Sequence, residues 1–439
     1  MADIVNQIRE AGVVGAGGAG FPTHVKSGSK VEFVLANGAE CEPLLHKDYE
    51  LMLLKAKEMV EGMMMMIEST GAKKGYFGIK SKNALAIEAV KAAIGSHPIE
   101  ITELGDFYPS GDEYELVYLA TGRLIPAGGI PLDVGCVVNN VETLMNVRRA
   151  ADEKPVTEKF LCVAGAVKNP SAFFVPIGTP AKEVIELAGG STEPEYSVFN
   201  GGLMMGKLMT NLDEPVTKTT AGFIVLPKKH QLVFRMGQPE ENWHRIGKSA
   251  CDQCTYCTEF CPRYLLGYNV QPHKVMRSLQ FTATGAGYWN QMAELCSGCG
   301  LCTLYACPED LFPREACDQS KRQMRLEGVK YVQTHPVKIH PMKEGRKVPL
   351  KMLMKKLNVS HLAADTPFVD VDYRPKEVVI KLKQAVGEPS EPKVALRDRV
   401  AKGDVIATIP EGKLGSTIHA SISGTVVDVN KEFIRILNN

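Results

Sequence analysis

The chain has 439 residues, of which 44% are hydrophobic and 23% charged, and its formal net charge at pH 7 is +1. Its length suggests about three domains, and its composition is typical of a folded globular protein. The balanced charge gives no indication of binding to nucleic acid or to an anionic membrane surface. No segment reaches the roughly 18 uninterrupted apolar residues of a membrane span, and the first residues, MADI, lack the features of a secretory signal, which predicts a cytoplasmic protein.

The first 150 residues alternate between short apolar segments and longer amphipathic ones. Residues 31–36 and 76–79 are expected to form buried strands and residues 48–68 and 84–94 helices, which predicts an α/β unit. Four consecutive methionines at positions 63–66 lie in the first of these helices. At helical spacing they are expected to fill gaps in a core rather than to bind a metal.

A glycine-rich segment, GVVGAGGAGFPTHVK, occupies residues 12–26. Glycines allow a backbone to approach a ligand closely and to direct several N–H groups at a phosphate, to which Lys26 would add charge. The segment follows neither standard nucleotide-binding template, because no Gly-Lys-Ser/Thr follows it and no clear strand precedes it. A flexible surface turn is the alternative.

Three further segments place polar groups at the ends of strand-like runs. They are LANGAECEP at residues 35–43, YPSGDE at 108–113 and VVNNVETL at 137–144. In an open α/β sheet, the carboxyl ends of the strands converge on a crevice where ligands bind. The sequence therefore predicts a ligand site formed by these segments and the glycine-rich loop. Cys41 lies in the first of them, but its neighbouring carboxylates raise a thiol pKa and disfavour a reactive role.

Residues 157–230 are expected to form a small β-rich module. Strands at 160–164 and 173–176 flank a turn, and a helix follows at about 181–188. Cys136 and Cys162 lie in apolar strand-like runs and are expected to be buried, inert thiols. The segments NGGLMMG at 200–206 and PVTKTT at 215–220 are interpreted as a surface loop and a strand.

Eight of the twelve cysteines form two closely spaced runs, each followed by proline. Such clustering, in a long chain without a leader, favours metal ligation in a reducing compartment over disulfides. The first run has the spacing C-x2-C-x2-C-x3-C-P, and the second has one more residue before its last cysteine. The runs are Cys251, Cys254, Cys257 and Cys261, and Cys296, Cys299, Cys302 and Cys307.

This spacing is typical of 4Fe–4S clusters. Three cysteines at two-residue gaps can direct their sulfurs at three corners of one cube, whereas so tight a loop cannot easily supply the fourth ligand. In two-cluster ferredoxins the fourth cysteine of each run ligates the other cluster. By this rule Cys307 completes the cluster of the first run and Cys261 that of the second. Structural zinc, usually held by two separated pairs, is the disfavoured alternative.

Residues 330–375 are rich in lysine and proline and are interpreted as a linker. Beyond it, alternating residues with glycine at turns predict a small β sandwich. The pattern is similar to a biotinyl- or lipoyl-type barrel-sandwich hybrid, but Ile418, His419 and Ala420 stand where a modified lysine would be expected. For His419, a structural or surface role is favoured over a ligand role.

In this order, the glycine-rich loop and the three polar segments closely resemble the flavin subunit of respiratory complex I, which binds FMN and NADH. The resemblance implies that Glu40 and Glu113 are the catalytic residues that hydrogen-bond nicotinamide or flavin, and that Phe21 stacks on NADH. Ala16, Ala39 and Asp112 depart from that family, which commonly has arginine, aspartate and glutamate there. The residues implied to bind the cofactors are Gly15, Gly17, Gly18, Gly20, Phe21, Lys26, Asn37, Gly111, Asn139, Asn140 and Thr143.

The whole chain is identified as a multidomain α/β member of the RnfC superfamily, which takes its name from a component of the membrane-bound Rnf complex. The expected domains are an FMN/NADH-binding α/β domain (1–155), an SLBB β-grasp module (157–235), a helical ferredoxin-type domain with two 4Fe–4S clusters (240–330) and an all-β barrel-sandwich hybrid (370–439). In the component of the membrane complex the sandwich is N-terminal. Its C-terminal position here resembles the cobalamin reductases of propanediol-utilisation microcompartments.

That resemblance implies an NADH-dependent reductase that converts cob(III)alamin to cob(II)alamin and, with an adenosyltransferase partner, continues to cob(I)alamin. It also implies a cytoplasmic location inside a bacterial microcompartment, among shell proteins. Two alternatives stay open. One is an electron-transfer protein of similar architecture that serves another reductase, such as proline reductase, and the other is a non-catalytic cluster-bearing scaffold whose flavin site has decayed.

Overall fold

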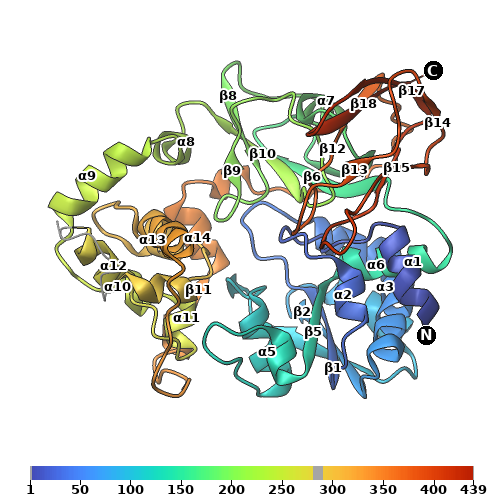
Figure 1. Ribbon diagram of the computed structural model, residues 1–439. Coiled ribbons are helices and arrows are strands. Elements are labelled where there is room, and N and C mark those ends of the chain that lie inside the picture. Colours follow the sequence, from blue (N-terminus) through green and yellow to red (C-terminus); the bar gives the residue numbers. More distant parts are fainter. Residues whose placement is uncertain (1, 280–289, 439) are drawn as a thin grey trace.

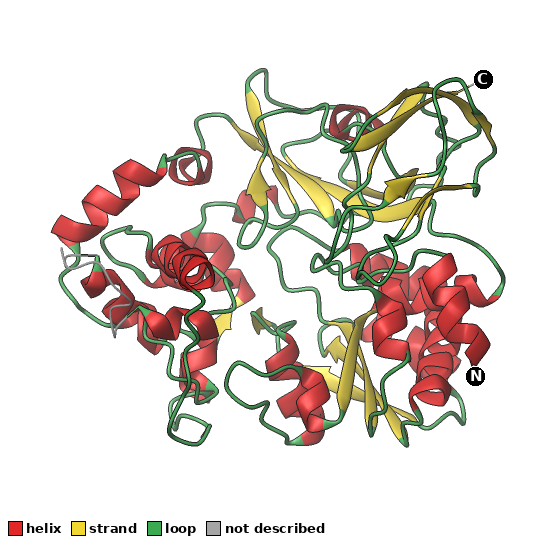
Figure 2. Cartoon of the chain, viewed as in Figure 1, coloured by secondary structure: helices red, strands yellow, loops and turns green. Residues whose placement is uncertain are grey.

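The computed structural model describes residues 2–279 and 290–438, which form four regions in sequence order (Figure 1). An α/β domain is followed by a small β-rich module, a helical region and an all-β domain. Figure 2 shows strands concentrated in the second and fourth regions and in one sheet of the first. None of the described helices combines the length and apolar character needed to cross a membrane.

The N-terminal domain alternates helices and strands up to residue 151. Its elements are α1 (Ala2–Glu10), α2 (Thr23–Ser27), β1 (Phe33–Gly38), α3 (Lys47–Thr70), β2 (Lys74–Lys80), α4 (Ala84–Ile94), β3 (Ile99–Leu104), β4 (Phe107–Tyr108), α5 (Glu113–Thr121), η1 (Pro131–Val134), β5 (Cys136–Asn140) and α6 (Val141–Ala151). Four strands form a parallel sheet in the order β3-β2-β1-β5. Helices α3 and α6 lie on one side of it and α5 on the other (Figure 1). A Cβ at Gly62 would lie 1.9 Å from the Leu144 carbonyl oxygen, so glycine is what lets α3 pack so closely on α6.

The first strand begins and ends two residues later than the sequence predicts. The amide of Val31 bonds to the Thr70 carbonyl and that of Glu32 to the Gly135 carbonyl, so both belong to the entry turn. At the other end, Asn37 and Gly38 still pair with β2. The predicted helix at 48–68 and strand at 76–79 are each slightly longer, and the helix at 84–94 has the predicted bounds.

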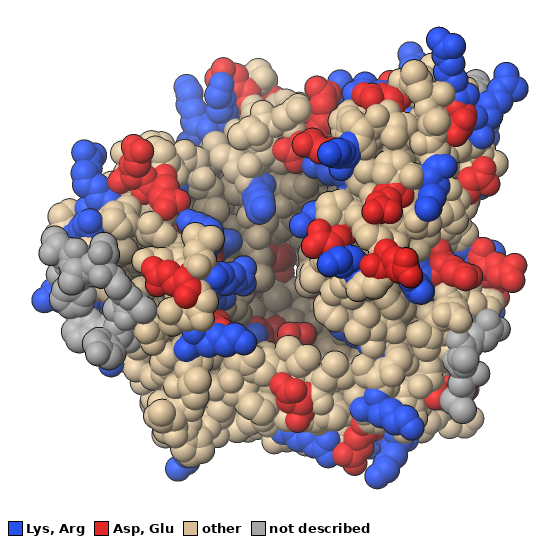
Figure 3. Space-filling view, in the orientation of Figure 1, with Lys and Arg blue, Asp and Glu red and all other residues tan. Residues whose placement is uncertain are grey.

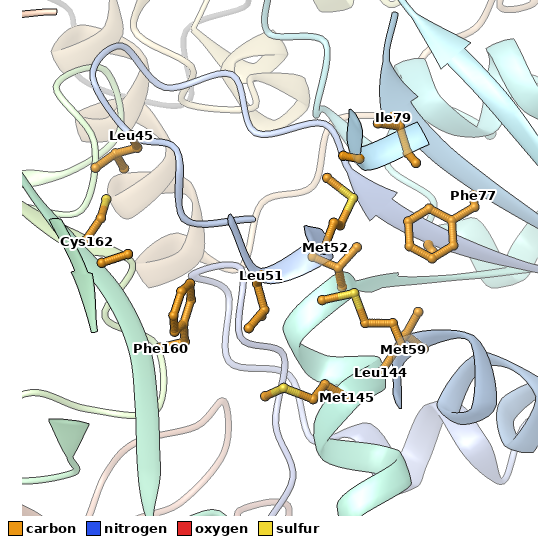
Figure 4. Packing of buried hydrophobic residues seen from close by; sticks show 14 of the residues in the cluster. Leu45, Leu51, Met52, Met59, Phe77, Ile79, Leu144, Met145, Phe160 and Cys162 are labelled. Carbon is orange, nitrogen blue, oxygen red and sulfur yellow. The ribbon is translucent and has the colours of Figure 1, made fainter. Parts of the chain in front are cut away.

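One hydrophobic core runs from the α/β domain into the next module. Figure 4 shows Met52 and Met59 beside Phe77, and Phe160 and Cys162 of the β-rich module at the other end. In the methionine run, positions 63 and 66 are fully buried and positions 64 and 65 pack against the same core, which confirms the predicted core role. The two regions therefore share buried apolar surface rather than meeting only at exposed loops.

The β-rich module has a five-stranded mixed sheet. Its elements are β6 (Glu158–Gly165), β7 (Ser171–Pro176), α7 (Ala181–Leu187), β8 (Tyr196–Asn200), β9 (Lys207–Leu208) and β10 (Gly222–Pro227). The strand order is β7-β6-β10-β8-β9, with β6 and β10 parallel and the other pairs antiparallel. One helix packed on such a sheet gives the expected β-grasp arrangement.

The helical region carries both cysteine runs. Its elements are α8 (Gln231–Met236), α9 (Glu240–Ala250), α10 (Tyr256–Glu259), α11 (Pro262–Leu265), α12 (Pro272–Ser278), η2 (Gln291–Leu295), η3 (Cys302–Ala306) and α13 (Pro313–Glu327). Helix α13 packs on α12, on η2 just before the second cysteine run and on η3 within that run. Figure 3 shows a deep hollow on this face, between the helical region on one side and the α/β and all-β domains on the other.

The interpretation of residues 330–375 as a linker is wrong for its middle part. That part contains η4 (Glu344–Arg346), β11 (Val348–Pro349), α14 (Leu350–Lys356) and η5 (Ser360–Leu362). Strand β11 pairs with β4 of the α/β domain, Val348 opposite Tyr108. Buried Val348, Leu350 and Leu353 hold this charged segment in place. We call residues 343–357 the strap, because they tie the helical region back to the first domain.

The C-terminal domain is a sandwich of two antiparallel sheets. Strands β12 (Glu377–Lys381), β18 (Phe433–Asn438), β17 (Gly424–Val429) and β14 (Arg399–Val400) form one, and β13 (Glu391–Pro392), β15 (Val405–Thr408) and β16 (Ile418–His419) form the other. Alternate residues of both sheets, such as Val378, Ile406 and Ile434, fill the space between them.

Candidate functional site

The glycine-rich segment forms a closed loop between α1 and α2. Val14 and Pro22 form a β-bridge, and the Gly15 amide donates to the Phe21 carbonyl at 2.9 Å. At the tip Gly18 has φ +108°, a conformation that side chains disfavour, and a Cβ there would meet no atom within 4 Å. The tip therefore has open space beside it and a backbone that only glycine adopts easily.

The loop rests on the start of α6. Ala16 donates its amide to Thr143 Oγ1 at 2.9 Å, and Gly17 faces Asn140, whose Cβ lies 3.3 Å from where a Cβ on Gly17 would be. Asn140 caps α6 by accepting from the Glu142 amide at 2.9 Å, which fixes the helix end under the loop. Thr143 is fully buried and thus holds the loop itself.

Strand ends bring the predicted asparagines together. In the register of β1 and β5, Asn37 lies opposite Asn140 and Ala36 opposite Asn139. Asn37 donates to the Gly111 carbonyl at 2.9 Å, which adds the segment at residues 108–113 to the same group. Contacts therefore bring predicted site residues from four separate segments together, and we call the place where they meet the crevice.

Three buried polar atoms in these segments have no partner within the described chain. They are the side-chain amide nitrogen of Asn139 and the hydroxyls of Ser110 and Thr23. An unpaired buried polar group costs about 1–3 kcal/mol, so such groups favour a polar ligand that satisfies them. Together with the open space at Gly18, these atoms fit a bound, phosphate-bearing polar molecule such as FMN.

Lys26 and Glu113 face each other across the crevice. Lys26 donates to the Val138 carbonyl at 2.6 Å and lies 5.8 Å from the centre of the Phe21 ring. Burial lowers the pKa of Lys26, and the Glu113 carboxylate opposes that shift. Burial likewise raises the pKa of Glu113, with Lys26 acting in the opposite direction. An anionic ligand would be attracted more strongly to this partly desolvated ammonium of Lys26 than to a fully solvated one.

Glu40 is half-buried and accepts a hydrogen bond from the Asp48 amide at 3.0 Å. Burial, strengthened by the nearby Asp48 carboxylate, raises the pKa of Glu40 to about 8. At neutral pH Glu40 therefore carries a proton. Cys41, next to it, is a neutral thiol, because burial raises its pKa to about 12.

A buried ionic network under the loop was not identified from the sequence. Glu142 accepts from Lys159 at 2.6 Å and from Lys47 at 3.1 Å, and Lys47 also pairs with Asp48 at 2.5 Å. Asp48 in turn accepts from Asn140 at 2.8 Å. The available signal was the charged pair Lys47-Asp48, which begins four residues after a predicted site segment, but nothing in the sequence marks Lys159 as a partner.

The last cysteine of each run lies beside cysteines of the other run. One cavity is lined by three cysteines of the first run and the last of the second: Cys251, Cys254, Cys257 and Cys307. In the other group, Cys261 lies within electrostatic range of Cys296 and Cys299. Across residues 2–279 and 290–438, no three His, Cys, Asp or Glu side chains are placed to hold a single metal ion.

The two cysteine groups differ in their surroundings. In the first, Cys254 is exposed, whereas Cys261, Cys299 and Cys302 of the second are buried. Cys317 of α13 is fully buried and packs in the same core cluster as Cys296. We call the first group the outer site and the second, with Cys296, the inner site.

Residues 108–113 connect the crevice to the inner site. The Tyr108 hydroxyl donates to the Cys299 carbonyl at 2.7 Å. Asp112 pairs at 3.0 Å with Arg263, two residues after Cys261, and its other oxygen caps α5. Because Gly111 and Glu113 lie in the crevice, one short segment contacts both places.

The interpretation of residues 200–206 as a surface loop is wrong. Leu203 and Met204 are buried, and the amides of Met204 and Met205 donate to the two oxygens of Glu42, each at 2.9 Å. A Cβ at Gly300 would lie 2.8 Å from the Met204 carbonyl oxygen. The loop is wedged between the Glu42 turn and the second cysteine run. The interpretation of residues 215–220 as a strand is also wrong, because only Pro215 pairs there, in an isolated bridge with Pro180, and Lys218 is buried in a turn.

His419 lies inside the molecule, as a structural residue would. Only 5% of it is exposed, and burial together with the nearby Lys218 ammonium lowers its pKa to about 3. Ile418, His419 and Ala420 are all buried, so this position is not an exposed attachment site.

Family models match all four regions of the chain. They are the Nuo51 FMN-binding domain at residues 8–149, the SLBB domain at 160–208, a 4Fe-4S dicluster domain at 250–312 and the RnfC barrel sandwich hybrid domain at 357–437. These matches confirm the fold class predicted from the sequence. They also identify the chain as flavin-binding and iron–sulfur-binding by family.

Three relatives illustrate the similarity. The "Cobalamin reductase PduS" of Salmonella typhimurium is 40% identical over 437 residues, which cover 99% of this chain and 96% of the relative. The protein of the same name from Citrobacter freundii is 39% identical over 436 residues, with the same coverage. A component of the Na(+)-translocating ferredoxin:NAD(+) oxidoreductase complex of Acetobacterium woodii is 36% identical over 274 residues, which cover 61% of this chain and 59% of the relative.

Proposed function

The chain belongs to the cobalamin reductase family of these relatives, and on that premise we propose that it is an NADH-dependent flavin and iron–sulfur enzyme that reduces the cobalt of a corrinoid. The main support for a route of electron transfer is that the segment at residues 108–113 contacts both the crevice and the inner cysteines. Electrons leaving the crevice would reach the inner site first and the exposed outer site second.

FMN would be held by the crevice. FMN, when bound, supplies the chemistry that accepts a hydride from NADH and releases its two electrons singly. The amides at Gly17, Gly18 and Gly20 and the ammonium of Lys26 would bind its phosphate. Asn37, Asn139 and Asn140 would bind the polar chain of the cofactor, and the unpaired Asn139 nitrogen supports this assignment.

NADH would bind beside the flavin. Phe21, at the end of the loop, would stack on the nicotinamide, and Glu40 and Glu113 would orient it through hydrogen bonds. Glu40 carries a proton at neutral pH and can therefore donate to the nicotinamide carbonyl without placing a second negative charge in the crevice. The wedge of residues 200–206 and the strap would exclude water from the path between the crevice and the inner site.

Two 4Fe–4S clusters would occupy the inner and outer sites. Cys251, Cys254, Cys257 and Cys307 would ligate the outer cluster, which their shared cavity supports. Cys261, Cys296, Cys299 and Cys302 would ligate the inner cluster. Each run thus gives three ligands to one cluster and one to the other, which locks the two sites together.

The proposed acceptor is cob(III)alamin, reduced to cob(II)alamin. The next step, to cob(I)alamin, lies at a much lower potential than NADH supplies, so it requires a partner that traps the product. An adenosyltransferase would do so, and the family resemblance supports a place among shell proteins inside a microcompartment. An electron-transfer protein that feeds a different reductase is the competing proposal.

The test is anaerobic reduction of cob(III)alamin by NADH with purified, cluster-loaded protein. Free reduced flavin also reduces cobalt, so the control is the Cys254→Ser/Cys299→Ser double variant with its flavin still bound. We expect wild type to be faster than the variant and faster than flavin alone. Equal rates would remove the clusters from the route. Brisk reduction of artificial dyes, with corrinoid reduced no faster than by flavin alone, would favour the competing proposal.

A further inference from the structure

Three carbonyl groups of the glycine loop accept hydrogen bonds from residues outside the first domain. They belong to Gly12, Ala16 and Gly20, at regular intervals along the loop. Their donors are Lys159 and Lys218 of the β-grasp module and, from the C-terminal domain, the Val386 amide and the Ser416 hydroxyl, which shares the Gly12 carbonyl with Lys218. The flavin domain therefore does not fix its own loop by itself.

Lys159 holds the middle of the loop from below. Its ammonium donates to the Ala16 carbonyl at 3.1 Å and to Glu142 at 2.6 Å, and 1% of its side chain is exposed. Thr143 accepts from the amide of the same Ala16. Both peptide groups that flank Ala16 are thus fixed by buried partners. These contacts also orient the backbone of the glycines that follow.

Lys218 holds the beginning of the loop and joins three regions. Its ammonium donates to the carbonyls of Gly12 and Thr417, both at 2.7 Å, and to the Ser416 hydroxyl at 2.9 Å. Its own amide donates to the Gln384 side chain at 2.9 Å. The α/β domain, the β-grasp module and the C-terminal domain meet at this one buried side chain.

The third contact holds the end of the loop. The Val386 amide donates to the Gly20 carbonyl at 2.9 Å. A Cβ on Gly20 would lie 3.0 Å from the Thr219 methyl group and 3.5 Å from the Ala385 Cα. The β-grasp module and the C-terminal domain therefore both pack against Gly20. Gly20 has φ +67°, which adds a conformational reason for glycine.

We propose that Lys159, Lys218 and the Val386 amide are positioning groups for the flavin site, and that the β-grasp module and the C-terminal domain hold the loop in its ligand-binding shape. The expected effect on FMN affinity rests on the proposed FMN site. A glycine loop loses much conformational entropy when it binds, so fixing its carbonyls beforehand raises affinity without a ligand contact. This gives the C-terminal domain, which has no modifiable lysine at its hairpin, a role in the enzyme.

The test compares the full-length variants Lys159→Met and Lys218→Met with Lys343→Met as the matched control. Lys343 is also a buried lysine, paired with Glu115 at 2.6 Å with 6% of its side chain exposed, and its described hydrogen bonds go to Glu115 and Glu344. Flavin is removed, and the dissociation constant of added FMN is measured well below the unfolding midpoint of each variant.

We expect the FMN dissociation constant to rise about tenfold or more in Lys159→Met and in Lys218→Met and to change little in Lys343→Met. Turnover of NADH with a dye should return close to the wild-type rate at saturating FMN, because no catalytic group is lost. A loop variant that binds FMN as tightly as wild type would overturn the proposal.

Hydrogen exchange separates this proposal from the flavin assignment. If wild type itself binds no FMN, the proposed flavin site fails, and the amides of residues 15–20 then decide the positioning claim. Their exchange in the flavin-free chain should be about tenfold faster in both loop variants than in Lys343→Met. Equal exchange in all three would contradict it.

Discussion

The cluster region and the flavin crevice reach their geometry by different routes. Each cysteine run places three of its ligands within seven residues, so most of a cluster site is formed by one short loop. The crevice instead combines the glycine loop, two strand ends and the segment at residues 108–113. Its loop is held by groups as distant in sequence as Lys218 and Val386. Local spacing therefore encodes the clusters, whereas long-range packing encodes the crevice.

The largest effect is expected when the fourth cysteine ligand of a cluster is removed, because this ligand alone comes from the other run. Cys307→Ala should remove the outer cluster and Cys261→Ala the inner one, although each cysteine lies in the other run. Each variant should hold about four irons instead of about eight. Iron analysis and EPR of the remaining cluster measure this, and a Cys307→Ala protein that lost the inner cluster instead would refute the exchange of ligands.

Lys26→Ala should affect only the crevice. Removal of a charge-assisted contact to a phosphate should weaken FMN binding by about 1.5–3 kcal/mol, or roughly tenfold to a hundredfold. The iron content should stay at the wild-type level, because the cysteine runs fold locally. Loss of both cofactors together would show that the two regions are not independent.

Glu40→Gln should change the pH dependence of the crevice. The pKa of Glu40 is about 8 against an ordinary 4.5, so the folded chain binds an extra proton between these values and loses stability as pH rises through that window. The variant keeps an oxygen that accepts from the Asp48 amide but cannot ionise. At pH 9 it should be more stable than wild type by roughly 1–4 kcal/mol.

The same substitution has a kinetic signature. Above pH 8 an ionised Glu40 adds negative charge to the crevice, so reduction of the wild-type flavin by NADH should slow as pH rises. Stopped-flow rates for Glu40→Gln should lack this step. A wild-type rate that is flat from pH 7 to pH 9 would remove Glu40 from that role.

Tyr108→Phe should have the smallest effect. It deletes one hydrogen bond to the Cys299 carbonyl, which contributes about 0.5–1.5 kcal/mol, and keeps the packing of the ring. We expect a slightly lower unfolding midpoint and an unchanged iron content. A large loss of inner-cluster iron would show that this bond, and not the cysteine loop, determines the inner site.

The same contrast explains what the sequence could predict. Strand ends, helix caps such as Asn140 and cysteine spacings are local properties, so they place the crevice segments and the cluster ligands on the correct elements. Three features depend on distant partners: the buried Lys218, the Glu42 contacts that bury residues 203–204, and the pairing of β11 with β4. In the sequence these segments are polar or glycine-rich, so they were interpreted as a strand, a surface loop and a linker, respectively. Their partners lie more than 150 residues away and have no local signal.

The order of electron transfer is the central claim, and rapid freeze-quench EPR after mixing with NADH tests it most directly. The Cys307→Ala variant keeps the inner cluster beside the segment at residues 108–113, and the Cys261→Ala variant keeps only the outer one. With flavin bound in both, the account predicts that the cluster of Cys307→Ala is reduced nearly as fast as in wild type and that of Cys261→Ala much more slowly. Faster reduction of the outer cluster in Cys261→Ala would contradict the route from the crevice through the inner site.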